Sequence, residues 1–251
     1  WQWRKGKWQW QARFYQAVYE NNSLLNWEAT GAEYERTFFR QTFARPELQA
    51  EYYLSDAHVF TFVGGHIWES VVASRYTSQK FFQTRYAFVQ HEWQPRKAWN
   101  ITTGARFDAH SVYGQQLSPK VALQYEILPS LSWRASLGRG FKAPDFRQLY
   151  LNFTNTIAGY SVFGTEELPE VLRRLQAEGQ LAEILFAPEE VGDLQAENAW
   201  GLNTGFRFER KGLVAELNVF RNDIENLIES QAFARRSNGQ NIFSYRNLRR
   251  V

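Results

Sequence analysis

The sequence predicts an all-β fold, a transmembrane antiparallel up-and-down β-barrel, and three observations predict it. Apolar and polar residues alternate with a period of two in one segment after another, as in strands whose two faces meet different surroundings. The connections between these segments alternate between tight turns and long polar stretches. Aromatic residues make up 17% of the chain, and tryptophans gather near segment ends, where a membrane barrel places its interfacial girdle.

Composition excludes several classes of protein. No run of about 18 apolar residues is present, so a transmembrane helix is excluded. There is no cysteine, and therefore no disulfide framework, thiolate nucleophile or cysteine-based metal site. The net charge of +3 implies no nucleic-acid partner. The chain opens without a signal-peptide pattern and has no methionine, so we expect a processed chain or an internal piece of a longer one.

Eleven strands follow from the breaks in the alternation. Tight turns are expected at residues 5–6, 55–56, 95–97, 128–130 and 210–212. Longer connections are expected at residues 21–33, 65–80, 110–118, 139–195 and 234–241. In the strand at 99–108, the pattern predicts that Ile101 faces lipid and Arg106 faces the lumen. An aromatic-rich soluble sandwich would show the same alternation, but the loop asymmetry and the strand lengths favour the barrel.

The longest connection, residues 139–195, has the length of a functional external loop. Leucines recur at roughly helical spacing, and Thr165 followed by two glutamates suits a helix N-terminus, so a short external helix, broken near Gly179, is expected at residues 166–185. The stretch GRGFKAPDFRQLYLNF at the entry loosely matches a phosphate-binding glycine motif. Such a motif needs a following helix, whereas Pro144 and the pattern after it predict extended chain.

Five segments in order carry a resemblance to a known family: YAFVQHEWQ, WNITTGARFDAHSVYGQQLSPKVALQYE, SWRASLGRGFKAPDFRQLYLNF, GDLQAENAWGLNTGFRFE and VFRNDIENLI. From about Tyr86 to Val251 the chain resembles the TonB-dependent outer-membrane receptors, in the branch of the cobalamin, catecholate-siderophore and haem receptors. The resemblance implies a 22-stranded barrel around an N-terminal plug domain. The eleven expected strands are about half of that barrel. Residues 1–251 are therefore expected to be a partial barrel without the plug domain and the C-terminal strands.

Candidate ligand-binding residues lie at the entry of the longest loop and where two strands are expected to reach external loops. A bulky, partly polar ligand needs apolar area and a few placed polar groups, which these residues supply. They are Phe141, Asp145, Phe146, Arg147, Tyr150, His66 and His110. Charged residues on the expected lumen face either contact the plug or form hydrogen bonds and ion pairs with one another along the barrel wall. They are Arg106, Asp108, Arg134, Arg207 and Glu209.

The expected function is binding and TonB-dependent active import of a scarce, bulky nutrient (siderophore-iron, cobalamin or haem) in the bacterial outer membrane. The four histidines lack metal-ligand spacing, so no metal or cofactor is expected. No G-x-S-x-G elbow is present, and no enzymatic chemistry is expected. The resemblance implies that a haem receptor carries a histidine in the longest loop; residues 141–194 contain none, which disfavours haem. Expected partners are the TonB complex through the missing plug segment, the nutrient, membrane lipid and a surface lipoprotein. A passive porin-like channel and an outer-membrane barrel enzyme remain as alternatives.

Overall fold

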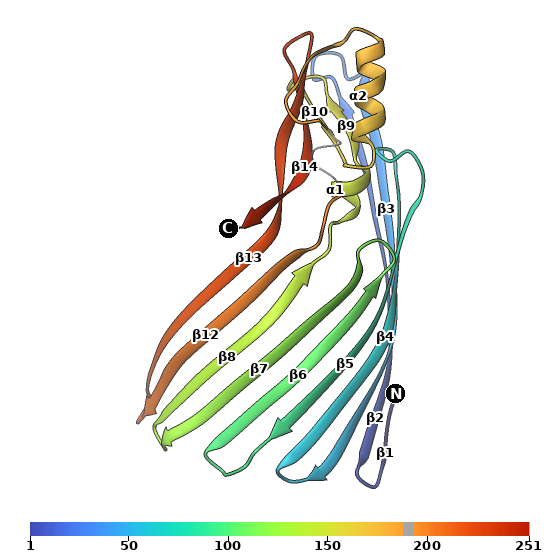
Figure 1. Cartoon of the computed structure of the whole chain (residues 1–251). Helices are drawn as coiled ribbons and strands as arrows, with labels where there is room; N and C mark the ends of the chain where they lie inside the picture. The colour runs from blue at the N-terminus through green and yellow to red at the C-terminus, as the bar shows by residue number, and fades with distance from the viewer. Residues whose placement is uncertain (188–192, 251) are drawn as a thin grey trace.

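The computed structural model describes residues 1–187 and 193–250, and its main feature is one curved antiparallel sheet (Figure 1). Eight strands precede the longest loop and three follow it, each paired with its neighbour along the chain. Their bounds are β1 Gln2–Lys5, β2 Trp8–Asn26, β3 Glu33–Ser55, β4 His58–Ala73, β5 Lys80–Trp93, β6 Trp99–His110, β7 Gly114–Leu128, β8 Leu131–Lys142, β12 Glu197–Arg210, β13 Leu213–Arg236 and β14 Asn241–Arg250. This confirms the predicted eleven-stranded meander within the described residues. Val251 and residues 188–192 of the expected loop lie outside them.

The five tight turns are confirmed, whereas four of the longer connections were predicted too long, and the one expected at 234–241 covers only 237–240. Residues 21–33, 65–80 and 110–118 narrow to 27–32, 74–79 and 111–113. The strands continue because backbone pairing between β2 and β3, for example, extends from Trp8 to Asn26 without regard to side-chain polarity. Polar side chains therefore mark where a strand leaves the lipid-facing apolar zone of the membrane. They do not mark where its backbone hydrogen bonds to the neighbouring strand end.

The two faces of the sheet differ as the alternation predicts. We call inner the face on which Phe82 of β5 contacts the long loop. Following the strand register from Phe82, Arg106 and Asp108 of β6 lie on the inner face and Phe107 lies on the outer face. Asp108 is only 2% exposed, while Phe107 is 40% exposed. Outer-face partners such as Leu137 and Leu202 also lie opposite one another and are exposed, which gives a continuous apolar outer surface.

The long loop folds into small elements of its own. They are α1 Phe146–Tyr150, β9 Asn152–Asn155, β10 Tyr160–Phe163, α2 Leu168–Ala177 and β11 Leu181–Ile184. β10 pairs in parallel with β14, and β11 pairs antiparallel with β13, so the loop extends the sheet at one end. We call this the loop end. Neither helix in the described part of the chain is long and apolar enough to cross a membrane.

Two predictions for this loop need correction. The helix expected at 166–185 covers only 168–177: the break near Gly179 is present, with a positive φ of 67° at that residue, but the helix does not resume, because residues 181–184 pair with β13. The segment after Pro144, expected to be extended, forms α1 instead. A reciprocal cap between Asp145 and Gln148 stabilises this short helix, and sequence alternation alone did not reveal it.

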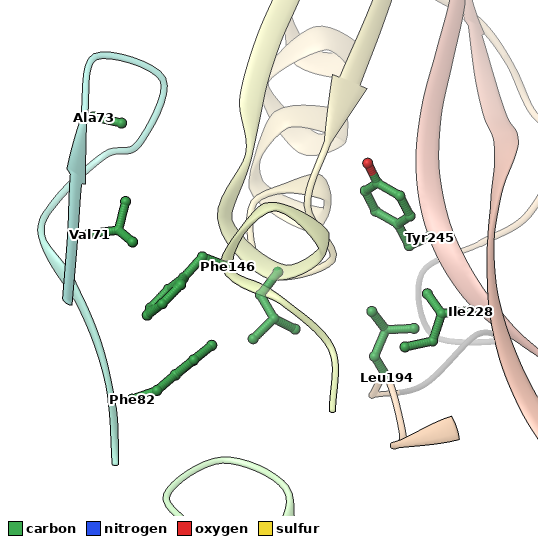
Figure 2. Packing of buried hydrophobic residues seen from close by; sticks show 8 residues of the cluster. Val71, Ala73, Phe82, Phe146, Leu194, Ile228 and Tyr245 are labelled. Atoms are coloured by element: carbon green, nitrogen blue, oxygen red, sulfur yellow. The ribbon is translucent and has the colours of Figure 1, made fainter. Parts of the chain in front are cut away.

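Two apolar clusters hold the loop in place. The first (Figure 2) lies around α1, which connects the β4–β5 pair of strands to the β13–β14 pair. These two pairs are not adjacent in the sheet. The buried members of this cluster are Val71, Ala73, Phe82, Phe146, Leu149, Leu194, Ile228 and Tyr245. The second packs α2 on the β13–β14 hairpin, with buried members Phe163, Leu168, Val171, Leu172, Leu175, Phe233, Ala234 and Ile242. The loop is thus a packed cover over the loop end of the inner face.

Candidate ligand-binding site at the loop end

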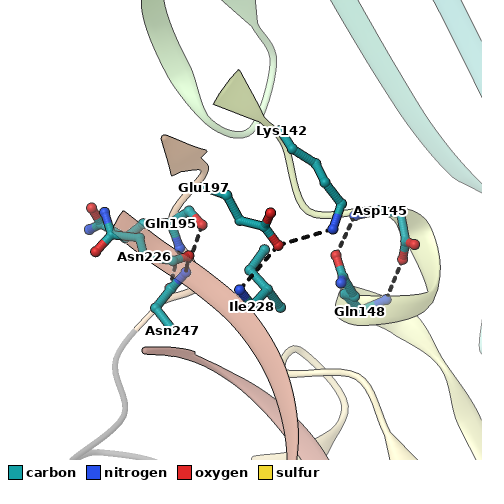
Figure 3. A network of polar contacts seen from close by, with 8 residues as sticks. All are labelled: Lys142, Asp145, Gln148, Gln195, Glu197, Asn226, Ile228 and Asn247. Atoms are coloured by element: carbon teal, nitrogen blue, oxygen red, sulfur yellow. Dashed lines mark hydrogen bonds and ion pairs between the residues drawn. The ribbon is translucent and has the colours of Figure 1, made fainter. Parts of the chain in front are cut away.

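The site begins with the way the chain enters the long loop. Pro144 is buried and precedes Asp145, whose carboxylate accepts the backbone N–H of Gln148 at 2.7 Å. The side-chain oxygen of Gln148 accepts the backbone N–H of Asp145 at 2.9 Å (Figure 3). The ring of Phe146 then stacks on Phe82 with 3.8 Å between centroids and 9° between planes. α1 is therefore held by the cap at its N-terminus and by the contact of Phe146 with β5.

The chain leaves the loop through a second set of polar contacts (Figure 3). The side-chain amide of Asn247 on β14 pairs with both backbone groups of Gln195, at 2.8 and 3.0 Å, and donates to the carbonyl of Asn226 at 2.6 Å. Glu197 accepts from Lys142 at 3.0 Å and from the backbone N–H of Ile228 at 3.1 Å. These bonds join the loop exit to β8, β13 and β14.

A cavity of about 630 Å³ lies between α1 and the loop ends of β2, β3 and β4. Its volume is that of a site for a sizeable small molecule. The lining combines apolar and aromatic faces, short polar side chains and charged groups. The lining residues are Asn21, Ser23, Thr37, Phe38, Phe39, Gln41, Val71, Ala73, Ser74, Arg75, Tyr76, Asp145, Phe146, Arg147 and Leu151.

Charge in this cavity is predominantly positive. Arg147 is exposed and has no ion-pair partner among the described residues. Arg75 lies 3.2 Å from Glu35 and stacks over the ring of Phe153 at 4.1 Å, while its Nε is buried without a hydrogen-bond partner in the described structure. Asp145 is the acidic lining residue, and its carboxylate is engaged in capping α1. The cavity can therefore offer guanidinium donors to an anionic group.

Tyrosines around α1 remain neutral hydrogen-bond donors. Burial, aided by the nearby Asp145, raises the pKa of Tyr76 to about 12. Burial also raises the pKa of Tyr113 and of Tyr150. The Tyr113 hydroxyl is buried and lacks a hydrogen-bond partner among the described residues. The phenol of Tyr76, which lines the cavity, can therefore donate to a ligand oxygen at neutral pH.

The structure brings part of the predicted site together. Asp145, Phe146 and Arg147 line the cavity. Tyr150 lies beside them, with the ammonium of Lys80 4.4 Å above its ring. His110 lies on the inner face, with its ring 5.0 Å from that of Phe82, so it supports the aromatic cluster under α1.

Phe141 and His66 do not belong to this group. The register places Phe141 of β8 on the outer face, two residues beyond Arg139. His66 also lies on the outer face, where its ring stacks on Trp68 at 4.0 Å. The sequence predicts a connection from residue 65, but β4 continues to Ala73, and the alternation of faces along this strand directs His66 away from the cavity.

Several lining residues were not predicted. Arg75 and Tyr76 lie in the short β4–β5 connection, and Ser23 and Thr37 face each other across the β2–β3 hairpin. Residues 21–26 read NNSLLN, without apolar–polar alternation, so the sequence carries no period-two signal that β2 continues there.

The predicted lumen-facing charges do lie on the inner face, and most satisfy one another. Arg106 and Asp108 form an ion pair at 2.7 Å. Arg207 pairs with Glu209 at 2.8 Å and with Glu216 at 2.5 Å. Arg134 has no ion-pair or hydrogen-bond partner within the described residues.

An antiparallel meander with an apolar outer face, a polar inner face and one long packed loop defines the wall of an outer-membrane β-barrel. A family model described as TonB-dependent receptor-like, β-barrel, matches residues 1–251. The chain belongs to this family. Members of the family are outer-membrane proteins of Gram-negative bacteria, and this places the chain in the outer membrane.

Relatives of known function are receptors and transporters. The vitamin B12 transporter BtuB of Vibrio cholerae is 35% identical over 96 residues, which are 37% of this chain and 15% of the transporter. The ferric enterobactin receptor of Pseudomonas aeruginosa is 28% identical over 130 residues, which are 52% of this chain and 15% of the receptor. The matched segments thus span a small part of each relative.

Solved structures agree in fold. The siderophore receptor PirA from Pseudomonas aeruginosa superposes with a TM-score of 0.64 at 18% identity, covering 99% of this chain and 49% of that receptor. The Serratia marcescens hemophore receptor HasR, solved with its hemophore and heme, gives a TM-score of 0.70 at 14% identity, covering 98% of this chain and 42% of that receptor. The chain therefore spans less than half the length of these structures.

Proposed function

We propose that this chain is part of the barrel wall of a receptor that binds a bulky nutrient at the loop-end cavity and imports it with energy from TonB. The observation that carries the proposal is the open cavity of about 630 Å³ that residues of α1 and the β2–β3 hairpin line above the inner face. Guanidinium groups, aromatic rings and hydroxyls converge there, as binding without covalent chemistry requires. The named relatives, receptors and transporters, support a function other than catalysis.

The lining favours an anionic, aromatic-rich ferric siderophore over cobalamin and haem. Arg147 is unpaired, and Arg75 presents a guanidinium that already stacks on an aromatic ring. Such groups suit negatively charged, planar oxygen ligands. No histidine is among the lining residues described, so a direct iron ligand for haem is not provided by this cavity.

The remaining parts of the proposal concern the longer protein. Further strands would close the sheet, since bare strand edges in lipid cost several kilocalories per mole for each unpaired backbone group. A plug domain in the lumen would meet the inner-face charges Arg106, Asp108, Arg134, Arg207 and Glu209. TonB would act through that plug, and a surface lipoprotein would be a further partner at the loop end. A plug distinguishes this receptor from a passive porin-like channel.

The test is uptake of radiolabelled iron as ferric enterobactin by cells that carry the full-length receptor. Arg147→Ala should reduce uptake sharply at unchanged surface expression. The matched control is Arg173→Ala, because Arg173 is an exposed arginine of the same loop that pairs with Glu170 within α2. Equal uptake by both variants and the wild type would reject the cavity as the binding site. Uptake of cobalamin or haem in place of the siderophore would reject the ligand class.

A further inference from the structure

Cations on the inner wall fall into two groups. Those in the first have acidic partners on the same or a neighbouring strand: Arg13 with Glu47 at 3.4 Å, and Arg106 with Asp108 at 2.7 Å. The second group has no acidic partner among the described residues: Arg4 and Arg45 lie over the rings of Tyr53 and Tyr15, whereas Lys120 on β7 and Arg134 on β8 have no ring contact either. Neither Lys120 nor Arg134 forms an ion pair or a hydrogen bond within the described part of the chain.

Lys120 and Arg134 line the same hollow of about 310 Å³, nearer the turn end of the sheet than the ligand cavity. Apart from these two cations, its polar lining is neutral. The neutral polar side chains are Asn100, Thr102, Gln124, Ser136, Asn203, Thr204 and Asn218. Glu126 is the nearest acidic residue along β7, but it forms no ion pair with Arg134. A lining of two free cations and neutral amides is complementary to an anion.

Glycines beside Lys120 and Arg134 leave this hollow without side chains at those positions. Lys120 lies between Gly104 and Gly138 in the strand register, and Gly205 lies opposite Arg134. A Cβ added at Gly205 would collide with the Asn218 side chain and would lie 2.5 Å from the carbonyl oxygen of Leu217. The side chains of Lys120 and Arg134 therefore rise from a surface that neighbouring side chains do not cover.

We propose that Lys120 and Arg134 form an oxyanion-binding site on the inner wall. A carboxylate or a similar oxyanion would bridge the ammonium of Lys120 and the guanidinium of Arg134, and the surrounding amides would donate further hydrogen bonds. The anion has two sources: a free anionic solute in the lumen, or an Asp or Glu side chain of a polypeptide segment that packs against the wall. This site rests on the proposed enclosed lumen, but it lies apart from the loop-end cavity.

The test uses the purified full-length receptor and its thermal unfolding midpoint, with inorganic phosphate as the probe and chloride at equal ionic strength as the reference. The variant is Lys120→Gln/Arg134→Gln. The control is Arg96→Gln/Lys97→Gln, which removes the same charge from the exposed β5–β6 turn. A free-anion site predicts that phosphate raises the midpoint of the wild type and of the control, and leaves that of the variant unchanged.

A bound carboxylate predicts a different pattern. The midpoint of the variant falls below those of the wild type and the control in chloride, and a carbodiimide links the Lys120 amine to an acidic residue elsewhere in the receptor, detected by mass spectrometry. Either pattern supports the site. The proposal is overturned if variant and control behave alike in both salts and Lys120 forms no cross-link. Siderophore uptake is not the readout, so this failure is separate from a failure of the proposed function.

Discussion

The stacking of Phe146 on Phe82 makes α1 the element whose loss should most affect ligand binding. Phe146 is 7% exposed, and its ring lies parallel to that of Phe82 at 3.8 Å. Truncating a buried phenylalanine to alanine costs about 3–5 kcal/mol, of which the ring pair accounts for about 0.5–1.5 kcal/mol. α1 has five residues, far fewer than a helix needs to be stable alone. Phe146→Ala should therefore undock α1 and displace Arg147, the next residue.

Ligand binding must then supply the free energy that redocks α1. Each 1.4 kcal/mol is a factor of ten in affinity, so a cost of about 3 kcal/mol predicts a loss of roughly 100-fold. The assay is equilibrium binding of ferric enterobactin to the purified full-length receptor, with limited proteolysis of the loop as a measure of undocking. Phe141→Ala is the matched control, because Phe141 lies five residues earlier and faces outward.

We expect that Phe146→Ala weakens binding and opens the loop to protease, while Phe141→Ala does neither. Wild-type affinity in Phe146→Ala, with a protected loop, would refute the claim that this ring pair holds the site. A folded but non-binding Phe141→Ala would refute the face assignment on β8.

Three further perturbations test the fold and the electrostatics. Leu202→Arg on the outer face should cost about 2–4 kcal/mol of folding free energy in lipid bilayers, whereas Asn203→Arg on the inner face should cost much less; equal costs would contradict the assigned faces. Gly205→Ala should lower folding yield, because its Cβ would press on the Leu217 carbonyl, while Gly140→Ala, with open space around its Cβ, should be tolerated. The pKa of Tyr76 is raised from 10.0 to about 12, so its contribution to stability is complete below pH 10 and disappears as pH rises toward 12. Tyr76→Phe should flatten that part of the stability profile, and an unchanged profile would show that the phenol is not buried in solution.

The main architecture could be predicted from sequence because it depends on a pattern that side chains carry directly. The alternation of Ile101 with Arg106 and Asp108 in β6 reflects the two faces of a strand, and glycine- or proline-containing turns set the ends of most strands. The eleven-stranded order followed from these two signals.

The candidate site was less accessible to this reasoning, for physical reasons. Strand pairing beyond the apolar band uses backbone groups, so the polar residues of 21–26 concealed a continuing strand that carries Ser23. α1 depends on a cap between Asp145 and Gln148 and on Phe82, which is 64 positions before Phe146 in the chain. The Asp145–Gln148 pair has the local spacing of a capping box, which alternation does not register, whereas the contact with Phe82 is set by the fold and no local pattern encodes it.

The central claim is that a bulky anionic nutrient binds between α1 and the loop ends of β2 to β4. Hydrogen–deuterium exchange of the full-length receptor, with and without ferric enterobactin, measures this most directly. The account predicts ligand-dependent protection in residues 73–76 and 145–151, and no change in the β5–β6 and β7–β8 turns at the other end of the sheet. Binding with protection confined to other segments, or no binding of the siderophore while cobalamin or haem binds, would contradict it.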